Sequence, residues 1–200
     1  MYRTSDFHML SRIIPSSGET LPAIGMGTWQ TFDVMPGAYA PLQEVLSIFQ
    51  NEGGRLIDSS PMYGKAESVI GDIVLRLQQE TPLFMATKVW TQGAEAGRRQ
   101  MEDSFRKMKC RVIDLMQIHN LVDWKTHLPL LRRWKEEGRI RYIGLTHYQD
   151  SSHEALEAII STEAIDFVQF NYSIFSRHAE QRLLPRCADL GVATLINRPF

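Results

Sequence analysis

Residues 56–58 read LID, residues 59–83 read SSPMYGKAESVIGDIVLRLQQETPL and residues 84–88 read FMATK, and this stretch decides the fold. The short apolar runs at 56–58 and 84–88 flank a segment, 67–77, whose apolar residues recur at helical spacing. A strand, a helix and a second strand in this order are typical of two parallel strands joined by a crossover helix. The first run ends on Asp58 and the second on Lys88, so each places a charged side chain at a strand end.

The same alternation continues in both directions along the chain. Strand candidates recur roughly every 24–32 residues, a spacing that holds one strand, one helix and their loops. The predicted strands are 24–28, 56–58, 84–88, 113–119, 142–146, 167–170 and 193–196. The predicted helices are 41–51, 67–77, 94–108, 127–137, 152–160 and 179–190. Pro185 is expected to interrupt or shorten the last helix, because proline lacks a backbone N–H.

The pattern predicts one α/β domain, 1–200, with a β-hairpin (12–15 and 21–24) outside the main sheet. A closed (β/α)8 barrel takes about 250 residues. This sequence ends directly after its seventh predicted strand. We therefore expect an incomplete barrel of about seven strands that lacks its last β/α unit, and favour a fragment of a longer protein. The open barrel edge would invite self-association.

Composition narrows the class of partner. The formal net charge is −1 and both signs are interspersed, which argues against nucleic-acid and anionic-membrane partners. No apolar stretch nears the roughly 18 residues of a membrane span, and residues 1–10 lack the apolar block of a secretory signal. Cys110 and Cys187 lie apart and are expected to be reduced thiols. A cytoplasmic protein is expected.

Four polar residues at or just after strand ends carry the chemistry: Asp58, Tyr63, Lys88 and His119. In a parallel barrel the strand ends on one side converge on one site, so these residues can meet. A proton donor, a cation, a carboxylate and an imidazole suffice for acid-catalysed reduction of a carbonyl. Each also has a structural reading, as a core ion pair, a packed loop tyrosine or a structural histidine.

Three short motifs resemble the aldo/keto reductase family: Asp58 followed by SSPMYG (59–64), ATK (86–88) and QIH (117–119). Further support lies at 25–29, 138–144 and 167–172, so the match covers nearly the whole chain. The resemblance implies a (β/α)8 barrel that reduces aldehydes or ketones to alcohols with NADPH or NADH. It implies that a small-molecule carbonyl substrate is the partner. No metal-binding residue is predicted.

The resemblance also assigns the four roles. Tyr63 would donate a proton to the carbonyl oxygen as hydride arrives from the cofactor. A phenol with its ordinary pKa near 10 is a reluctant donor at neutral pH, so we expect Lys88 to lower that pKa. Asp58 would pair with Lys88 and orient it. His119 would hydrogen-bond the carbonyl oxygen and polarise it.

The cofactor-binding residues that the resemblance implies are Thr28, Thr146, His147, Gln169, Asn197 and Arg198. Gln169 matches an amide that binds the nicotinamide carboxamide, whereas Thr146-His147 stands where many members have Ser-Asn. A histidine offers fewer simultaneous hydrogen bonds than an amide. Asn197 stands where many members stack an aromatic ring on the nicotinamide.

Stacking on the nicotinamide would therefore have to come from Phe200 or Tyr172. Arg198 could meet a cofactor phosphate or a substrate carboxylate, or be a solvated loop residue. Trp29 and Trp90 are expected at the substrate mouth, where apolar rings suit an apolar substrate, although packing alone would also explain them.

Two other functions stay open. A non-enzymatic reductase-like regulatory or scaffold subunit is favoured by Asn197, by His147 and by the missing last unit. A metal-dependent barrel hydrolase would use Asp58, His119 and His147, which lack the usual spacing of metal ligands. The sequence names neither the substrate nor the preference between NADP and NAD.

Overall fold

A computed structural model describes residues 9–77 and 82–200. Residues 1–8, part of the segment in which no secretory signal is expected, lie outside the described residues. The strands are β1 (Ser11–Ile13), β2 (Thr20–Pro22), β3 (Met26–Gly27), β4 (Leu56–Asp58), β5 (Phe84–Val89), β6 (Ile113–His119), β7 (Ile140–Thr146), β8 (Phe167–Asn171) and β9 (Ala193–Asn197). The α-helices are α1 (Tyr39–Asn51), α2 (Ala66–Leu77), α3 (Ala94–Met108), α4 (Trp124–Glu136), α5 (His153–Ile160) and α6 (Leu183–Leu190).

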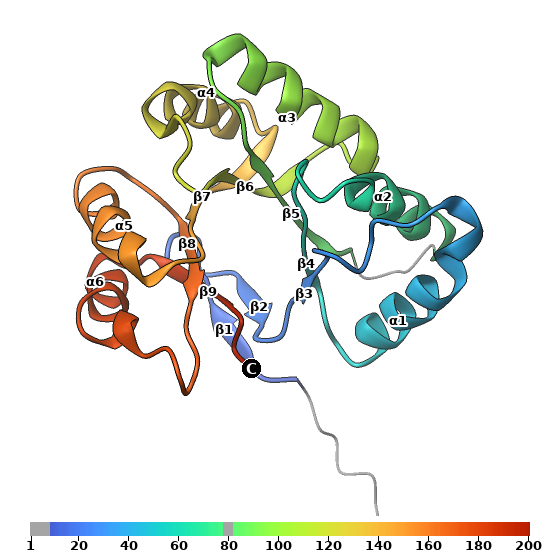
Figure 1. Ribbon diagram of the computed structural model, residues 1–200, viewed down its shortest axis with the longest axis horizontal. Coiled ribbons are helices and arrows are strands. Elements are labelled where there is room, and N and C mark those ends of the chain that lie inside the picture. The colour runs from blue at the N-terminus through green and yellow to red at the C-terminus, as the bar shows by residue number, and fades with distance from the viewer. Residues whose placement is uncertain (1–8, 78–81) are drawn as a thin grey trace, which may run out of the picture.

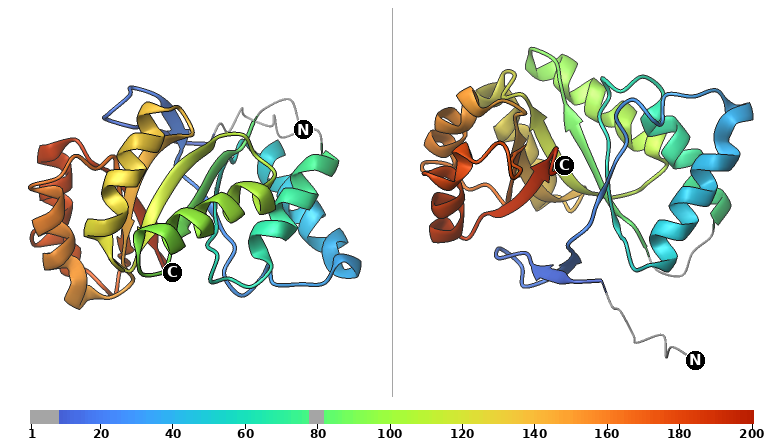
Figure 2. Two further views of the ribbon diagram at one scale, coloured as in Figure 1. Left: turned by 90° about the horizontal axis from the view of Figure 1, so that it is seen from above. Right: turned by 60° about the horizontal axis from the view of Figure 1, so that its bottom comes forward.

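The main sheet has seven parallel strands in the order β3-β4-β5-β6-β7-β8-β9, so each strand pairs with its neighbour in sequence. The sheet curls, and the six helices lie along its outer, convex side (Figure 1). In the described residues the curl stays open between β3 and β9, the two edge strands (Figure 2). The predicted incomplete barrel with an N-terminal hairpin is confirmed, and self-association through the open edge stays a prediction.

Side chains alternate along each strand between the inside of the curl and the helices. Ile57 and Met85 pack against α1 and α2 in one buried cluster, whereas Leu56 and Phe84 belong to a second cluster inside the curl. This period of two is the geometry of a β-strand. Because the inner cluster starts at Leu56 and Phe84, the residues two and four positions later also face inward.

The hairpin closes one end of this inner cluster. β1 and β2 pair antiparallel, and Ile14 and Leu21 from the hairpin pack with Tyr142 and Phe167. The rings of Tyr142 and Phe167 meet edge to face, with their centroids 5.4 Å apart. The hairpin therefore covers the end where the strands begin and leaves the end where they finish for the site.

Two of the element bounds that differ from the prediction have a clear physical reason. The last helix begins at Leu183 rather than at 179, after a short 3-10 turn, His178–Glu180. Pro185 lies in its first turn, where an N–H would have no partner within the helix, so proline is tolerated there. The first strand keeps only Met26–Gly27 of the predicted 24–28, because only these residues pair with β4.

Candidate active site

Strand alternation and register bring the predicted residues together at the end of the curl. Asp58 pairs in register with Ala86, and Lys88 two residues on pairs with Gln117. His119 ends β6 two residues after Gln117. The side chains of Asp58, Lys88, Gln117 and His119 therefore point into the curl at neighbouring levels.

Lys88 and Asp58 form a buried ion pair. The Nζ atom of Lys88 lies 2.7 Å from Oδ2 of Asp58 and also donates to the backbone oxygen of Ser59 at 2.6 Å. Lys88 is fully buried, with 0% of its surface exposed. A buried ammonium needs both a counter-charge and hydrogen-bond acceptors to stay charged, and this site supplies both.

Two glutamine amides complete the surroundings of Asp58. Gln117 Nε2 donates to Oδ1 at 2.8 Å, and Gln169 Nε2 donates to Oδ2 at 3.1 Å. Gly144 on β7 makes room for Gln117, because a Cβ there would lie 2.8 Å from Gln117 Cγ. The sequence did not single out Gln117 as a site residue, although its place two residues before His119 on an inward-facing strand is the signal that could have done so.

A tight turn returns Tyr63 to the strand end. The backbone N–H of Tyr63 donates to the oxygen of Ser60 at 3.0 Å. Gly64 follows with φ +61°, and a Cβ there would clash with the Asp33 carboxylate, so glycine is required at this position. Lys65 anchors the far side of the turn, where its N–H donates to Asp33 Oδ1 at 3.0 Å. The turn therefore fixes where the phenol can point.

Tyr63 lies against both the cation and the imidazole. Lys88 Nζ is 5.2 Å from the centroid of the phenol ring, and the ring of His119 meets it edge to face at 5.9 Å. Burial raises the pKa of the Tyr63 phenol above its ordinary 10.0, the Lys88 ammonium opposes that rise, and the Asp58 carboxylate adds to it. The expectation of a lowered pKa was wrong in its net direction, because desolvation outweighs the attraction to Lys88.

His119 is a neutral, buried imidazole. Its Nδ1 atom lies 3.0 Å from Ser60 Oγ. Burial, the positive charge of Lys88 and the imidazole of His147 together lower the pKa of His119 to about 3, with burial the largest cause. At neutral pH this side chain therefore acts as a hydrogen-bonding group and carries no charge.

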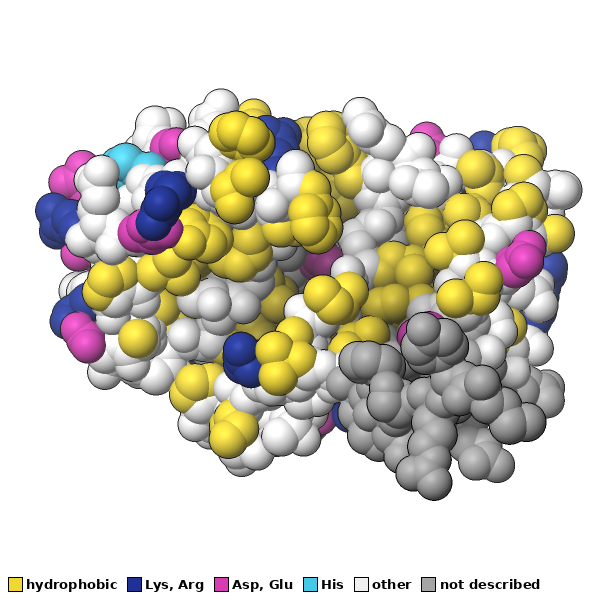
Figure 3. All heavy atoms as spheres, turned by 90° about the horizontal axis from the view of Figure 1, so that it is seen from below, with side chains coloured by type: hydrophobic (Ala, Val, Ile, Leu, Met, Phe, Trp, Pro, Cys, Tyr) yellow, Lys and Arg dark blue, Asp and Glu magenta, His cyan; other side chains and the backbone are white. Residues whose placement is uncertain are grey.

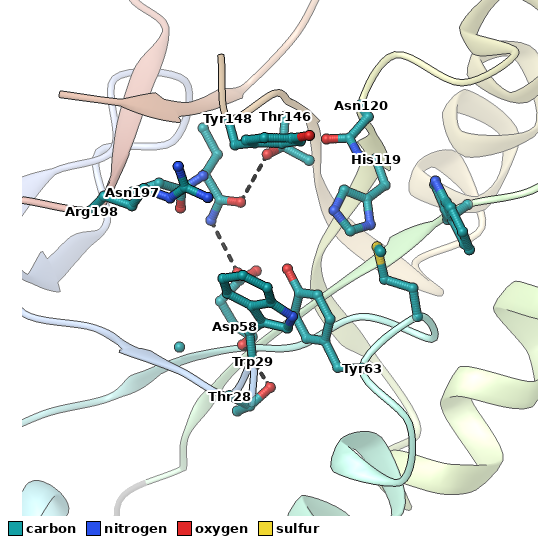
Figure 4. A pocket seen from close by; sticks show the side chains of 14 residues that line it. Thr28, Trp29, Asp58, Tyr63, His119, Asn120, Thr146, Tyr148, Asn197 and Arg198 are labelled. Carbon is teal, nitrogen blue, oxygen red and sulfur yellow. Dashed lines mark hydrogen bonds between the residues drawn. The ribbon is translucent and has the colours of Figure 1, made fainter. Parts of the chain in front are cut away.

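Asp58, Tyr63 and His119 open onto one cavity of about 630 Å³. It is lined by Gly27, Thr28, Trp29, Asp58, Met62, Tyr63, Trp90, His119, Asn120, Thr146, Tyr148, Gln169, Asn197 and Arg198. Figure 4 shows the phenol of Tyr63 and the imidazole of His119 on the same side of this space, with Asn197 and Arg198 across from them. The view from below in Figure 3 shows hydrophobic side chains gathered along a hollow across that face of the molecule.

Most of the predicted cofactor-binding residues line this cavity. Gln169 Oε1 accepts from Thr146 Oγ1 at 2.9 Å, which, with the bond to Asp58, fixes the orientation of the amide. The Thr28 hydroxyl lies 3.2 Å from the backbone oxygen of Asp58 and 3.0 Å from Ser59 Oγ, so its hydrogen bonding is structural.

His147 is not among the described residues that line the cavity. Its ring stacks on Tyr148 with centroids 5.5 Å apart, and its Nδ1 accepts from the backbone N–H of Gln149 at 3.3 Å. Neither alternative stacking ring lines the cavity either, since Tyr172 donates to Glu180 and Phe200 is fully exposed.

Aromatic rings form the rim. Trp29 is 53% exposed and Trp90 is 41% exposed, and both line the cavity, so their role at a substrate mouth stays a prediction. The side-chain amide of Gln100 clamps the backbone of Trp90, accepting from its N–H at 2.5 Å and donating to its oxygen at 3.1 Å. Tyr148, which the sequence did not single out, adds a ring beside the Arg198 guanidinium, 5.2 Å from the ring centroid.

The described residues contain neither a group of metal ligands nor a membrane-spanning helix. Among residues 9–77 and 82–200, no three His, Cys, Asp or Glu side chains are grouped so that they could hold a metal ion. Within the same residues, no helix is both long enough and apolar enough to cross a membrane.

The curled parallel sheet, the outer helices and a polar site at the strand ends define an open barrel of alternating strands and helices, and comparison with known proteins shows its family. The model of the aldo/keto reductase family matches residues 23–200. The chain therefore belongs to the aldo/keto reductase family.

Two curated relatives show how the chain compares in length. Aldo-keto reductase YhdN of Bacillus subtilis is 26% identical over 92% of this chain and 60% of its own length. The NADH-specific methylglyoxal reductase of Escherichia coli is 26% identical over 90% of this chain and 64% of its own length. The chain thus spans about three fifths of these two proteins.

Solved structures share the fold. The thermostable aldo-keto reductase Tm1743, solved with the inhibitor epalrestat, has a TM-score of 0.80 and is 27% identical, over 93% of this chain and 71% of its own. An aldo/keto reductase from Klebsiella pneumoniae, solved with NADP and acetate, has a TM-score of 0.74 and is 24% identical, over 88% of this chain and 64% of its own.

Proposed function

We propose that this protein is an NAD(P)H-dependent reductase that converts aldehydes or ketones to alcohols, with Tyr63 as the general acid. The observation that carries the proposal is the buried Lys88–Asp58 pair, 2.7 Å apart, beside a phenol and a neutral imidazole that open onto one cavity. An ion pair with only a structural role would need neither the phenol of Tyr63 nor the imidazole of His119 beside it.

The residue chemistry supports reduction. A carbonyl oxygen held between Tyr63 and His119 gains negative charge as its carbon is reduced. The Tyr63 phenol is protonated at neutral pH, and the Lys88 ammonium, which opposes the rise of its pKa on burial, favours release of the proton to that oxygen. Lys88 stabilises the phenolate left behind, and His119 supplies a hydrogen bond to the carbonyl oxygen.

The polar wall formed by Thr146, Gln169 and Asn197 suits the carboxamide of a nicotinamide. After its bonds to Asp58 and Thr146, the amide of Gln169 keeps one N–H and one lone pair free. When bound, NADP or NAD would supply the hydride. Arg198 gives this wall a positive charge suited to a phosphate or carboxylate.

The test follows oxidation of NADPH and NADH at the nicotinamide absorbance band, with methylglyoxal and an aromatic aldehyde as probes. We expect turnover by wild type and a loss of about 100-fold or more in kcat for Tyr63→Phe, which lacks only the acidic hydroxyl. Equal rates for the two proteins would contradict the proposal and favour the scaffold role.

A further inference from the structure

Ser60 is a buried residue that the proposed function does not use. It follows the strand end that carries Asp58 and precedes the turn that carries Tyr63, and its side chain is fully enclosed. Its hydroxyl oxygen lies 3.0 Å from Nδ1 of His119 and accepts the backbone N–H of Met62 at 3.3 Å.

The position of one hydrogen follows from these two contacts. A hydroxyl has a single hydrogen to donate, and the Met62 N–H already occupies one lone pair of Ser60 Oγ. Among the described residues, His119 Nδ1 is the acceptor that lies within reach of this hydroxyl. If Nδ1 carried the imidazole hydrogen instead, the hydroxyl hydrogen would be buried without a partner, which is unfavourable.

We propose that Ser60 is a positioning residue that fixes His119 in the tautomer with its hydrogen on Nε2. Nδ1 is then the acceptor of the serine hydrogen bond, and Nε2–H is the donor left for the cavity. The other tautomer would turn a lone pair toward a carbonyl oxygen and repel it. This role rests on the proposed function, since it decides whether His119 can donate to the substrate.

The neutral imidazole makes the choice of tautomer matter. Burial, Lys88 and His147 together lower the pKa of His119 to about 3, so at neutral pH only one ring nitrogen carries a hydrogen. A protonated ring would donate from both nitrogens and would need no help from Ser60.

The direct test is ¹⁵N NMR of the protein labelled at histidine, in the absence of cofactor, with the His119 signals assigned from His119→Asn. We expect Nε2 to be the protonated nitrogen and Nδ1 to be an unprotonated, hydrogen-bonded acceptor. Protonation of Nδ1 in the wild-type protein would overturn the proposal.

Paired serine variants separate this role from the general loss of a buried hydroxyl. Ser60→Ala should move the Nδ1 resonance away from its hydrogen-bonded position. Ser59→Ala should leave both His119 resonances in place, because Ser59 Oγ bonds to Thr28. Unchanged His119 resonances in Ser60→Ala would contradict the proposed role of Ser60.

Kinetics provide a second readout, because a folding defect alone would not produce the pattern of kcat and KM changes expected here. Ser60→Ala should lower kcat about tenfold, with the KM for the cofactor unchanged, since one transition-state donor is misplaced. Ser60→Thr, which keeps the hydroxyl, should recover activity. A loss confined to cofactor KM would count against the proposal.

The NMR measurement needs no turnover. If the protein reduces no carbonyl while the resonances behave as expected, the proposed function fails and the tautomer assignment stands. If carbonyls are reduced but Nδ1 is protonated, the proposed function stands and the tautomer assignment fails.

Discussion

Lys88 lies 2.7 Å from Asp58, and that one carboxylate also accepts both glutamine amides at its level of the curl, Gln117 and Gln169. The four groups form a hydrogen-bond network in which the carboxylate is surrounded by donors from three other strands. Such a network holds the ammonium beside Tyr63 more rigidly than an isolated pair would. It also makes the site sensitive to the removal of any one member.

Removing the carboxylate should destabilise the fold. Asp58→Asn leaves the buried ammonium of Lys88 without a counter-charge, and we expect the free energy of unfolding to fall by about 3 kcal/mol. Adding Lys88→Met should restore part of that loss. A double-mutant cycle in urea measures the coupling, and two effects that simply add would contradict the buried pair.

The pH dependence of reduction follows from Tyr63 and His119. The general acid must be protonated, and its pKa is raised above 10.0, so kcat should hold through neutral pH and fall only when the pH exceeds that value. On the acid side, the imidazole stays neutral until the pH approaches its pKa of about 3. A kcat profile that changed tenfold between about pH 6 and 8, the range of an ordinary histidine, would refute this assignment.

Gly144 should not tolerate a methyl group. A Cβ at Gly144 would lie 2.8 Å from Gln117 Cγ and 3.1 Å from Leu115 Cδ1. Gly144→Ala should therefore cost about 1–3 kcal/mol of unfolding free energy. The double variant Gly144→Ala, Gln117→Ala should regain part of it in a urea titration, because the clashing side chain is gone. No recovery would show that the strain lies elsewhere.

Glu67 should make stability depend on pH. Its carboxyl is buried in α2 and accepts from Thr87 Oγ1 at 2.6 Å, and burial raises its pKa above 4.5. A folded-state pKa above the unfolded value means that the native state binds the extra proton, so stability falls as pH rises from about 4.5 through the folded pKa.

Glu67→Gln removes that titration. Its unfolding free energy should decline less between pH 4.5 and 8 than that of wild type, with exposed Glu154→Gln as the control. Parallel slopes for Glu67→Gln and wild type would contradict the account.

Much of the fold could be predicted from the sequence, because apolar residues recur with a different spacing in strands than in helices. The bounds of β4, β6 and α3 match the predicted ranges, since each has a clear apolar period and polar flanks. The convergence of Asp58, Lys88 and His119 followed from the same alternation, because each ends an inward-facing series.

The remaining features depend on distances between strands, which periodicity does not encode. Gln117 on β6 reaches Asp58 on β4 because pairing through the one strand between them, β5, brings them to adjacent levels. His147 follows the end of β7, where alternation no longer dictates direction, and its ring turned to Tyr148 instead. Whether the pKa of Tyr63 rises or falls depends on how deeply the phenol is buried, and the presence of Lys88 in the sequence does not reveal that depth.

The most direct test of the central claim is the fate of the hydride. Methylglyoxal is incubated with the protein and with NADPH deuterated at its transferable position, and the alcohol is examined by mass spectrometry. We predict one deuterium on the carbinol carbon with wild type and a yield at least 100-fold lower with Tyr63→Phe. Alcohol without deuterium, or equal yields from both proteins, would contradict a reductase built on Tyr63, Lys88 and His119.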